Sequence, residues 1–379
     1  MKKSKVAIIG LGYVGLPLAM AVQTKHPTLG FDISNTRIEL LQKHLDITNE
    51  VSRKELIDAC NLRFSSDEKN LKDCGVYIIT VPTPIDSSNR PDLGYLTDAT
   101  KLVAKYLAKD NCVIYESTVY PGVTEEECIP ILESVSGMKV NADFWVGYSP
   151  ERVNPGESSK KITDIVKVTS GTTEAAADFV AEFYSGFIDA GIFKAPSIKT
   201  AEAAKVVENI QRDVNIALMN ELAILFEKLD IDTHDVIQAA SSKWNFHKYE
   251  PGLVGGHCIG IDPYYLIHKS EQVGVYTDVI KSARKVNEKM SNIIAMKIIS
   301  SLVSVGVDLR GSKVAVMGVT FKENCPDIRN SKVFDIVKIL ESHKLEVDLI
   351  DPIADQENVF CETGYQMSDK LDQKYIAII

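Results

Sequence analysis

The chain has 379 residues, which at roughly 150 residues per domain predicts two or three domains, each with its own core. Its 42 Lys and Arg residues against 52 Asp and Glu residues give a net charge of −10, so nucleic acid is not expected as a partner. The hydrophobic fraction of 45% and the charged fraction of 25% exclude a disordered chain and are typical of a globular protein.

The first residues carry positive charge and then apolar side chains, as a secretory signal does. Glycines interrupt that apolar stretch from Gly10 onward, and the chain has no run of about 18 apolar residues that would cross a bilayer. We therefore expect a cytoplasmic protein with no membrane partner. The 7 cysteines are scattered without a CxxC pair, which predicts neither a disulfide framework nor a metal site.

Five short runs rich in β-branched residues alternate with helical stretches in the early part of the chain. They are Val6–Ile9, Leu29–Phe31, Val76–Val81, Cys112–Glu116 and Phe144–Gly147. Such alternation is typical of a parallel sheet wrapped by helices, the doubly wound or Rossmann class of α/β folds. We assign residues 1–195 to this first domain.

The segment Ser197–Asp230 contains no Gly or Pro and follows a helical apolar rhythm over 34 residues. A continuous helix of that length would be about 50 Å long. Long helices commonly connect domains or pack against a second copy of the chain, so we expect a homodimer. Residues 196–300 form the predicted central helical domain for dimerisation and catalysis.

The segment Gly311–Gly318 opens a second α/β unit, and Glu346–Asp351 supplies another strand. We assign residues 301–379 to this Rossmann-like third domain. The chain stops in a strand-like run, Lys374–Ile379, where a parallel sheet would continue with a loop and a helix. We therefore expect the third domain to be truncated.

A glycine motif, Gly10-Leu11-Gly12-Tyr13-Val14-Gly15, follows the first predicted strand and precedes a helix expected over 16–24. Gly10 allows the tight turn, and Gly12 lets the backbone approach a pyrophosphate at the helix N-terminus. Gly15 lets the helix pack closely on the strand. The motif therefore predicts a dinucleotide cofactor.

Asp32 ends the second predicted strand 22 residues after Gly10, where its carboxylate would bind an adenosine ribose. A carboxylate at that place repels a 2′-phosphate, so the pattern predicts NAD rather than NADP. Arg37 has two interpretations: it stacks on adenine or reaches a phosphate, or it is a solvated helix residue. Val81, Pro82 and Thr83 end the third run and are expected to line the nicotinamide side.

The segment 251–263 places four glycines around Cys258. A glycine-rich loop lets a ligand approach closely, so this thiol is the candidate nucleophile. A thiol needs a nearby cation or a helix N-terminus to become a thiolate at neutral pH. Asp262-Pro263 is typical of a helix start, so Asp262 is either a functional carboxylate or only a cap. His257 is expected to contact the substrate.

Lys205, Asn209 and Arg212 are spaced by four and three residues on the long predicted helix, and therefore lie on one face. In a partly desolvated cleft, Lys205 would stabilise an oxyanion or orient water as part of a base system. A solvated helix face is the alternative.

Three further polar residues follow predicted strands. Thr118 comes after one strand, and Glu151 and Arg152 come after the next. Because ligands bind at the carboxyl ends of strands in open α/β sheets, we expect all three to be functional.

Seven ordered segments resemble the UDP-glucose/GDP-mannose dehydrogenase family over essentially the whole chain. They are GLGYVGLP (10–17), VPTP (81–84), ESTVYPG (116–122), SPERVNPG (149–156), AEAAKVVEN (201–209), GGHCIGIDPYYL (255–266) and GVTFKENCPDIRNS (318–331). The resemblance implies two successive NAD-dependent oxidations at one site, which take C6 of a nucleotide sugar from alcohol through aldehyde to carboxylate. It also implies a UDP-binding third domain.

The resemblance implies roles for the candidate residues. Cys258 adds to the aldehyde and passes through a thiohemiacetal to a thioester that water cleaves. Lys205 and Asn209 hold the oxyanion, and Asp262 assists Lys205 in proton transfer. Thr118 and Glu151 position water or act in acid–base steps. The resemblance also implies that Phe321 and Lys322 contact UDP and that Arg329 contacts the cofactor phosphates. Arg152 and Arg212 are implied to contact the sugar.

The segment SPERVNPG narrows the subgroup, since enzymes that act on UDP-glucose commonly carry PEFLREG there. Together with GGHCIGIDPYYL it resembles the N-acetylhexosamine branch. The segments AEAAKVVENIQRDVNIALMNELAILF, SSKWNF and FKENCPDIRN resemble the 6-dehydrogenases of Vi-antigen and O-antigen biosynthesis. The resemblance implies UDP-GlcNAc or UDP-GalNAc as substrate, for a surface polysaccharide such as a capsule or O-antigen. UDP-ManNAc and UDP-glucose stay open.

Two other classes compete with this interpretation. A 3-hydroxyacid-type dehydrogenase shares the N-terminal fold and a helix with Lys and Asn, but it performs one oxidation and does not need Cys258. An NAD-binding scaffold would bind NAD without turning over a UDP-sugar.

Overall fold

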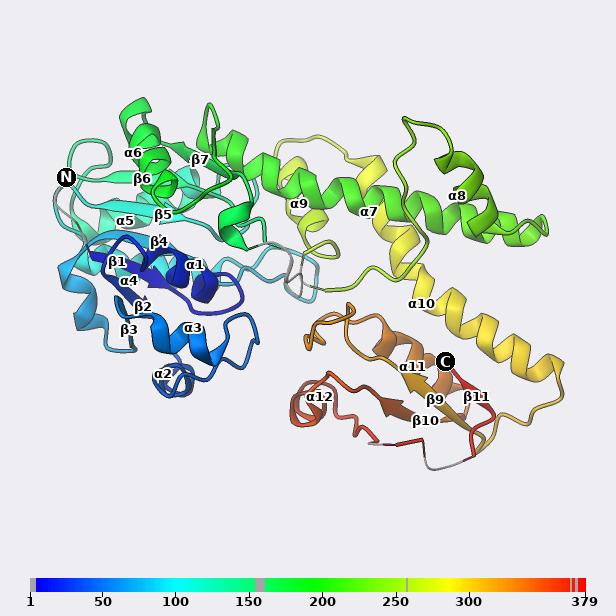
Figure 1. Ribbon diagram of the computed structural model, residues 1–379. Coiled ribbons are helices and arrows are strands. Elements are labelled where there is room, and N and C mark those ends of the chain that lie inside the picture. Colours follow the sequence, from blue (N-terminus) through cyan, green and yellow to red (C-terminus); the bar gives the residue numbers. More distant parts are fainter. Residues whose placement is uncertain (1–4, 154–160, 257, 369, 372–373) are drawn as a thin grey trace. The chain divides into compact units, whose positions relative to one another are not determined.

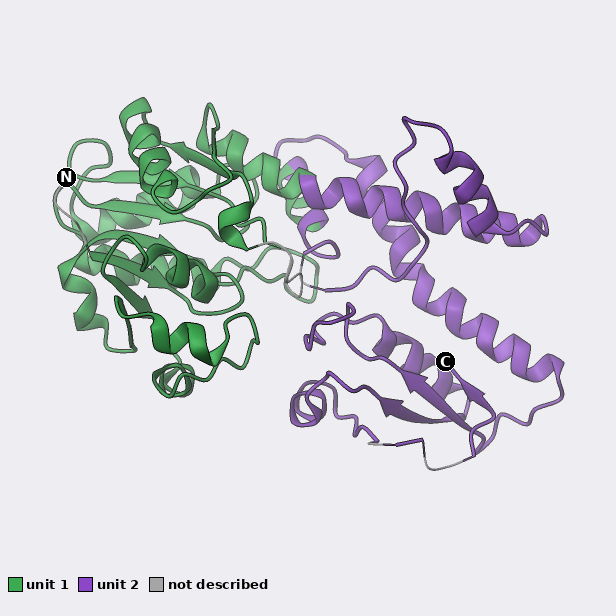
Figure 2. Cartoon of the chain, viewed as in Figure 1, with its two compact units in different colours: residues 1–207, 264–269 green, residues 208–263, 270–379 purple. Residues whose placement is uncertain are grey.

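The computed structural model describes residues 5–153, 161–256, 258–368, 370–371 and 374–379. The chain divides into two compact units (Figure 2). Unit 1 comprises residues 1–207 and 264–269, and unit 2 comprises residues 208–263 and 270–379. Two helices, α7 (Ile198–Lys228) and α9 (Asp262–Gln272), contribute residues to both units.

Unit 1 is built on an eight-stranded sheet in the order β3-β2-β1-β4-β5-β6-β7-β8. The strands are β1 (Lys5–Ile9), β2 (Thr28–Phe31), β3 (Leu62–Ser65), β4 (Cys74–Ile79), β5 (Cys112–Tyr115), β6 (Trp145–Tyr148), β7 (Lys167–Gly171) and β8 (Ile192–Lys194). Neighbours are parallel except β6 and β7, which are antiparallel. The chain runs from β1 outward to β3 and returns to β4 beside β1 (Figure 1). Open α/β sheets bind ligands at such a reversal, at the carboxyl ends of the strands.

Helices pack on this sheet because alternate strand residues present apolar side chains to them. The helices are α1 (Gly15–Val22), α2 (Asn35–Gln42), α3 (Arg53–Asp58), α4 (Gly94–Tyr106), α5 (Ile129–Ser136) and α6 (Glu174–Ser185). On one face, Ile8 of β1 and Ile78 of β4 share a core cluster with Leu16 of α1 and Val180 of α6. Burial of each such side chain contributes about 1.5–3 kcal/mol relative to exposure. This core supports the strand ends that carry the candidate site.

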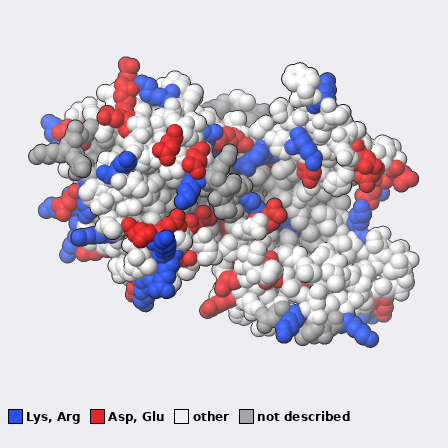
Figure 3. Space-filling model, viewed as in Figure 1, with Lys and Arg blue, Asp and Glu red and all other residues white. Residues whose placement is uncertain are grey.

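Unit 2 contains the greater part of α7 together with α8 (Thr233–Ser241) and α10 (Asp278–Ser304). Helix α7 has 31 residues and α10 has 27. Within the ranges that the structure describes, no helix is both long enough and apolar enough to cross a membrane. On the face seen in Figure 3, Lys and Arg side chains are interspersed with Asp and Glu.

The C-terminal part of unit 2 is a three-stranded parallel sheet in the order β10-β9-β11. It consists of β9 (Lys313–Met317), β10 (Glu346–Ile350) and β11 (Ala377–Ile378), with helices α11 (Val333–Ser342) and α12 (Gln356–Thr363). Ile299 of α10, Val316 of β9 and Val337 of α11 share its core. Helix α10 is therefore anchored to this sheet by apolar packing.

The doubly wound first unit and the second α/β region that the sequence predicts are confirmed. The predicted long helix is α7, and α9 begins at Asp262, where Asp262-Pro263 predicts a helix start. Sequence analysis missed β3, β7 and β8. These strands are short and mix charged with apolar residues, as in KVTSG of β7, so they lack the continuous apolar run that marks β1 or β4.

Candidate active site

The glycine motif forms a tight turn between β1 and α1. Gly10 has a φ of 94°, a backbone conformation that side chains disfavour. A Cβ atom added at Gly15 would lie 1.8 Å from the Gly10 carbonyl oxygen, so α1 packs on the turn with no room for a side chain. A Cβ atom at Gly12 would meet no protein atom within 4 Å, which leaves that side of the turn open. This open backbone surface fits a dinucleotide pyrophosphate.

Asp32 and Arg37 both contact the glycine turn. One Asp32 carboxylate oxygen accepts a hydrogen bond from the Leu11 N–H at 2.9 Å, and the other accepts from the Ser34 N–H at 2.9 Å. Arg37 is buried, its Nε donates to the Leu11 carbonyl at 2.9 Å, and its guanidinium pairs with Asp46 at 2.8 Å. Arg37 thus braces the glycine turn, and it does not lie on a solvated helix face.

The carboxyl ends of β4 and β5 meet through side-chain hydrogen bonds to the main chain. The Thr83 hydroxyl donates to the Thr118 carbonyl at 2.7 Å, and the Ser117 hydroxyl donates to the Val81 carbonyl at 2.6 Å. The hydroxyl of Tyr265, a buried residue of α9, donates to the Thr83 carbonyl. The structure therefore brings together the segments that sequence analysis assigned to the nicotinamide side and to Thr118.

Lys205 and Glu151 form a buried pair in unit 1. Their side chains are 7% and 10% exposed, and Nζ of Lys205 lies 4.0 Å from Oε2 of Glu151. Burial raises the pKa of the Glu151 carboxyl, although the Lys205 ammonium and the Val153 N–H oppose that shift. The burial of Lys205 favours the cleft interpretation of this helix face over the solvated one. Arg152, the next residue after Glu151, donates to the Val166 carbonyl at 2.9 Å.

Sequence analysis missed two buried groups that support the same strand ends. Lys167 of β7 pairs with Glu116 at 2.6 Å, and the Tyr184 hydroxyl donates to the same carboxylate. Glu202 of α7 accepts hydrogen bonds from the N–H groups of Gly122 at 2.6 Å and Thr124 at 3.0 Å. Glu116 and Glu202 both lie in segments quoted for the family resemblance, but no local pattern shows their partners.

Within unit 2, Asn209 connects two other predicted site residues. Its Nδ2 donates to Oδ2 of Asp262 at 2.5 Å, and its Oδ1 accepts from Arg212. Both Asn209 and Asp262 are buried. Asp262 therefore does more than begin α9, because its carboxylate is held by a side chain of α7. Lys205 lies one turn before Asn209 on the same helix.

Cys258 is half-buried and lies at the turn that starts α9. Its carbonyl accepts hydrogen bonds from the N–H groups of Ile261 at 3.1 Å and Asp262 at 2.9 Å. His257 lies outside the described residues.

The residues carried over for nucleotide contacts lie in the segment between β9 and α11. Phe321 packs on the glycine-rich segment, since a Cβ atom at Gly256 would lie 2.6 Å from its ring. Lys322 is half-buried, and its carbonyl accepts from the Thr320 hydroxyl at 2.9 Å. Arg329 forms an ion pair with Asp327 at 2.5 Å. Among the described residues, no group of three or more His, Cys, Asp or Glu could hold a metal ion.

Three domains of one family match successive parts of the chain. The NAD binding domain of the UDP-glucose/GDP-mannose dehydrogenase family matches residues 4–188, its central domain matches residues 199–289, and its UDP binding domain matches residues 315–377. These domains and the open glycine turn define an NAD-dependent dehydrogenase of nucleotide sugars.

Individual relatives match over nearly the full chain. A UDP-N-acetyl-D-glucosamine 6-dehydrogenase from Salmonella typhi is 50% identical over 99% of this chain and 88% of its own length. An enzyme of the same name from Pseudomonas aeruginosa is 50% identical over 96% of this chain and 86% of its own length. The structure of a UDP-D-ManNAc dehydrogenase from Pyrococcus horikoshii superposes with a TM-score of 0.88 at 32% identity, covering 97% of this chain and 85% of that one. The chain belongs to the UDP-glucose/GDP-mannose dehydrogenase family.

Proposed function

We propose that this protein oxidises C6 of UDP-N-acetylglucosamine, or of the C4 epimer UDP-N-acetylgalactosamine, to the uronic acid with two equivalents of NAD. The observation that carries the proposal is the half-buried Cys258 thiol at the start of α9, next to the Asn209–Asp262 hydrogen bond. A single-oxidation dehydrogenase does not use such a thiol. The N-acetylglucosamine assignment is supported by relatives of that name at 50% identity, against 32% for the UDP-D-ManNAc dehydrogenase. We propose surface polysaccharide synthesis as the use of the product.

The cofactor site is proposed on the residues around the glycine turn. NAD would supply the hydride acceptor for both oxidations. The proposed cofactor contacts are Gly10 to Gly15, Asp32, Arg37, Val81, Pro82, Thr83, Thr118 and Arg329. Asp32 follows β2 directly, where we assign it to the adenosine ribose, and Arg37 would contribute by holding the carbonyl of Leu11.

The proposed chemistry uses the chain's own groups in order. As the C6 hydrogen leaves as hydride, a base that contains Asp262 and Lys205 takes the hydroxyl proton, which gives the aldehyde. The Cys258 thiolate adds to the aldehyde carbon, and Lys205 and Asn209 hold the resulting oxyanion. Loss of the second hydride gives a thioester.

Hydrolysis completes the proposed cycle. Water held by Thr118 and Glu151 attacks the thioester carbon, the C–S bond breaks, and the carboxylate leaves while the thiol is restored. Burial raises the pKa of Glu151 and so favours its protonated form, which suits a carboxyl that exchanges protons in the site. The proposed substrate contacts are Glu151, Arg152, Lys205, Asn209, Arg212, His257, Phe321 and Lys322.

We also propose three domains, at 1–195, 196–300 and 301–379, and a homodimer formed through the central domain. Exposed apolar side chains on α7 and α10 support a self-association surface, among them Leu218, Leu225 and Met296. Light scattering that gives the mass of one chain would contradict the dimer.

The proposed location is the cytoplasm, where NAD and nucleotide sugars are available.

The test is the count of NADH formed per sugar consumed with UDP-GlcNAc, UDP-GalNAc, UDP-ManNAc and UDP-glucose. We expect about two NADH per sugar with an N-acetylhexosamine substrate, and at most about one for Cys258→Ala. Cys60→Ala, which removes an exposed thiol elsewhere, is the matched control and should behave as wild type. A ratio of about two in Cys258→Ala would contradict the mechanism, and NAD binding without turnover of any sugar would favour the scaffold interpretation.

A further inference from the structure

A buried amide on α7 holds the main chain of the segment that leads to Cys258. Nδ2 of Asn220 donates to the Gly252 carbonyl at 3.0 Å, and Oδ1 of Asn220 accepts from the Gly252 N–H at 2.8 Å. Asn220 is fully buried and 32 residues away from Gly252 in sequence. One side chain thus satisfies both the donor and the acceptor of a single glycine.

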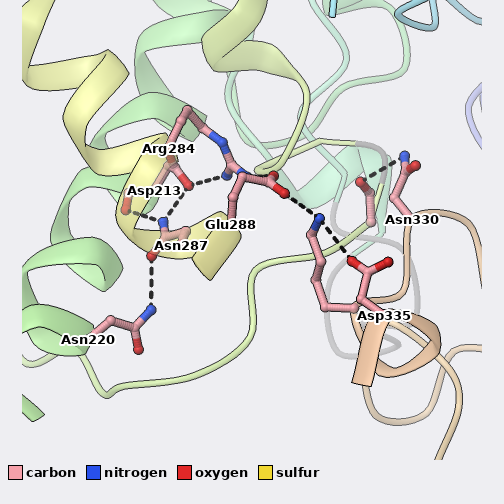
Figure 4. Close-up of polar contacts among 9 residues, drawn as sticks. Asp213, Asn220, Arg284, Asn287, Glu288, Asn330 and Asp335 are labelled. Carbon is pink, nitrogen blue, oxygen red and sulfur yellow. Dashed lines mark hydrogen bonds and ion pairs between the residues drawn. The ribbon is translucent and has the colours of Figure 1, made fainter. Parts of the chain in front are cut away.

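Asn220 is itself held by a polar network between α7 and α10 (Figure 4). Its Nδ2 also donates to Oδ1 of Asn287 at 2.8 Å, and Nδ2 of Asn287 donates to the Asp213 carboxylate at 2.7 Å and the Asp213 carbonyl at 3.0 Å. Arg284 pairs with the same carboxylate at 2.6 Å. Because Asn287 uses its donors on Asp213, its oxygen is directed to Asn220. This fixes which atom of Asn220 donates and which accepts.

A second residue, Asn330, also contacts the glycine-rich segment. Nδ2 of Asn330 lies 3.4 Å from the Gly256 carbonyl, and a Cβ atom at Gly255 would lie 2.7 Å from the Asn330 carbonyl oxygen. In Figure 4, Asn330 lies apart from Asn220 and Asn287. The network reaches the same region through Glu288, which pairs with Lys332 at 2.6 Å.

The segment 251–256 has no helix or strand of its own. Glycines lose much conformational freedom when they are ordered, so side chains must hold the segment in place. Cys258 lies two residues after Gly256, and its carbonyl accepts a hydrogen bond from the N–H of Asp262, the first residue of α9. A shift of the glycine segment would therefore move the thiol.

We propose that Asn220, oriented by Asn287 and Asp213, is a positioning residue that sets the place of the Cys258 thiol for addition to the aldehyde. The proposal rests on the proposed function for the role of the thiol. It predicts that loss of the amide slows the second oxidation more than the first and leaves NAD affinity intact, because the described hydrogen bonds of Asn220 go to Gly252 and Asn287 and not to the cofactor turn.

The test is Asn220→Asp, which keeps the shape of the side chain and replaces its donor by an acceptor. The carboxylate would face the Gly252 carbonyl and the Asn287 oxygen, so the segment would loosen. We expect the second oxidation to slow by about 10- to 100-fold, as for a reacting group displaced by a fraction of an ångström to 1 Å. We also expect faster alkylation of Cys258 by iodoacetamide, measured by mass spectrometry on the Cys258 peptide.

Asn215→Asp is the matched control, because Asn215 lies on the same helix and its described hydrogen bond stays within that helix, to the Gln211 carbonyl at 2.7 Å. It should match wild type in alkylation and in NADH per sugar. If Asn220→Asp does not fold, Asn330→Gly takes its place. Asn330 has a φ of 54°, which glycine adopts readily, so this variant removes the contact with Gly256 without backbone strain. For Asn330→Gly we also expect a slower second oxidation and faster alkylation of Cys258, but both changes should be smaller than in Asn220→Asp.

Slower second oxidation together with faster Cys258 alkylation in a folded variant would support the proposal. Wild-type alkylation in a folded Asn220→Asp, or equal slowing of both oxidations, would overturn it. If the wild-type enzyme turns over no UDP-sugar, the proposed function fails, while the alkylation rates still show whether Asn220 positions Cys258.

Discussion

The two glycine-rich segments of this protein are held in place by different means. The cofactor turn at 10–15 lies between a strand and a helix, and its first N–H donates to the Phe31 carbonyl of the next strand at 2.8 Å. The segment at 251–256 has no regular structure, and Asn220 and Asn330 hold it from distant parts of the chain. The first segment should therefore be most sensitive to added volume, and the second to a change of hydrogen-bonding group.

The largest effect is expected for Gly15→Ala. The new Cβ atom would lie 1.8 Å from the Gly10 carbonyl oxygen and 2.5 Å from the Thr80 hydroxyl, so α1 or the turn must move. We expect a loss of at least about 4 kcal/mol in the free energy of unfolding, measured by urea denaturation, or failure to fold. Gly12→Ala meets no protein atom and should fold normally but bind NAD weakly. Similar stability of the two variants would show that volume is not what the turn excludes.

The next largest effect on stability is expected for the buried ion pair between Lys167 and Glu116, and it tests whether buried charge also stabilises the cofactor side. Lys167→Met leaves the Glu116 carboxylate buried without its cation. Breaking a buried pair in this way costs about 3–5 kcal/mol, which chemical denaturation would detect. The double variant Glu116→Gln with Lys167→Met should recover part of the loss. A double variant less stable than Lys167→Met would contradict this explanation.

A pH-dependent effect is expected for Glu202, which holds the Gly122 and Thr124 N–H groups. Burial raises the pKa of this carboxyl from 4.5 to about 7, against the opposing effect of those hydrogen bonds. A raised pKa means that the fold favours the protonated form. The stability contribution is thus fully present below about 4.5 and is lost as the pH rises through about 7.

The measurement is the difference in unfolding free energy between wild type and Glu202→Gln as a function of pH. The wild type should lose roughly 3 kcal/mol relative to the variant between the two pKa values. The matched control is Glu127→Gln, which removes an exposed carboxylate from the neighbouring helical turn Thr124–Cys128. A constant difference across this pH range would show that the fold does not raise the pKa of Glu202.

The smallest effect on the unfolding free energy is expected for an ion pair at the surface, which serves as the comparison for the buried pair. Lys101 pairs with Asp98 at 3.0 Å, and both side chains are more than half exposed. Lys101→Ala should change the unfolding free energy by no more than about 0.5 kcal/mol. A loss as large as that of Lys167→Met would mean that burial does not explain the difference between the two pairs.

Features that depend on neighbouring residues were predicted from the sequence. The glycine turn, the helix start at Asp262 and the span of α7 follow from backbone conformation and apolar periodicity over short distances along the chain. The glycine-rich loop and the helix spacing singled out Cys258, Lys205 and Asn209, and the family resemblance added the reaction in which we propose that they act. The strand β7, by contrast, was missed, because its residues gain their stability from partners elsewhere in the sheet.

The partners of the buried polar groups could not be predicted. Asn209 meets Asp262 across 53 residues, Glu116 meets Lys167 across 51, and Asn220 meets Gly252 across 32. In the sequence, Asn220 is one polar residue on a long helix and is indistinguishable from a solvated one. Its role follows from burial, which leaves a polar side chain no water to bind and makes a protein partner necessary. Local pattern thus specified the elements of this protein, and the packing of distant elements specified which of its polar side chains hold one another.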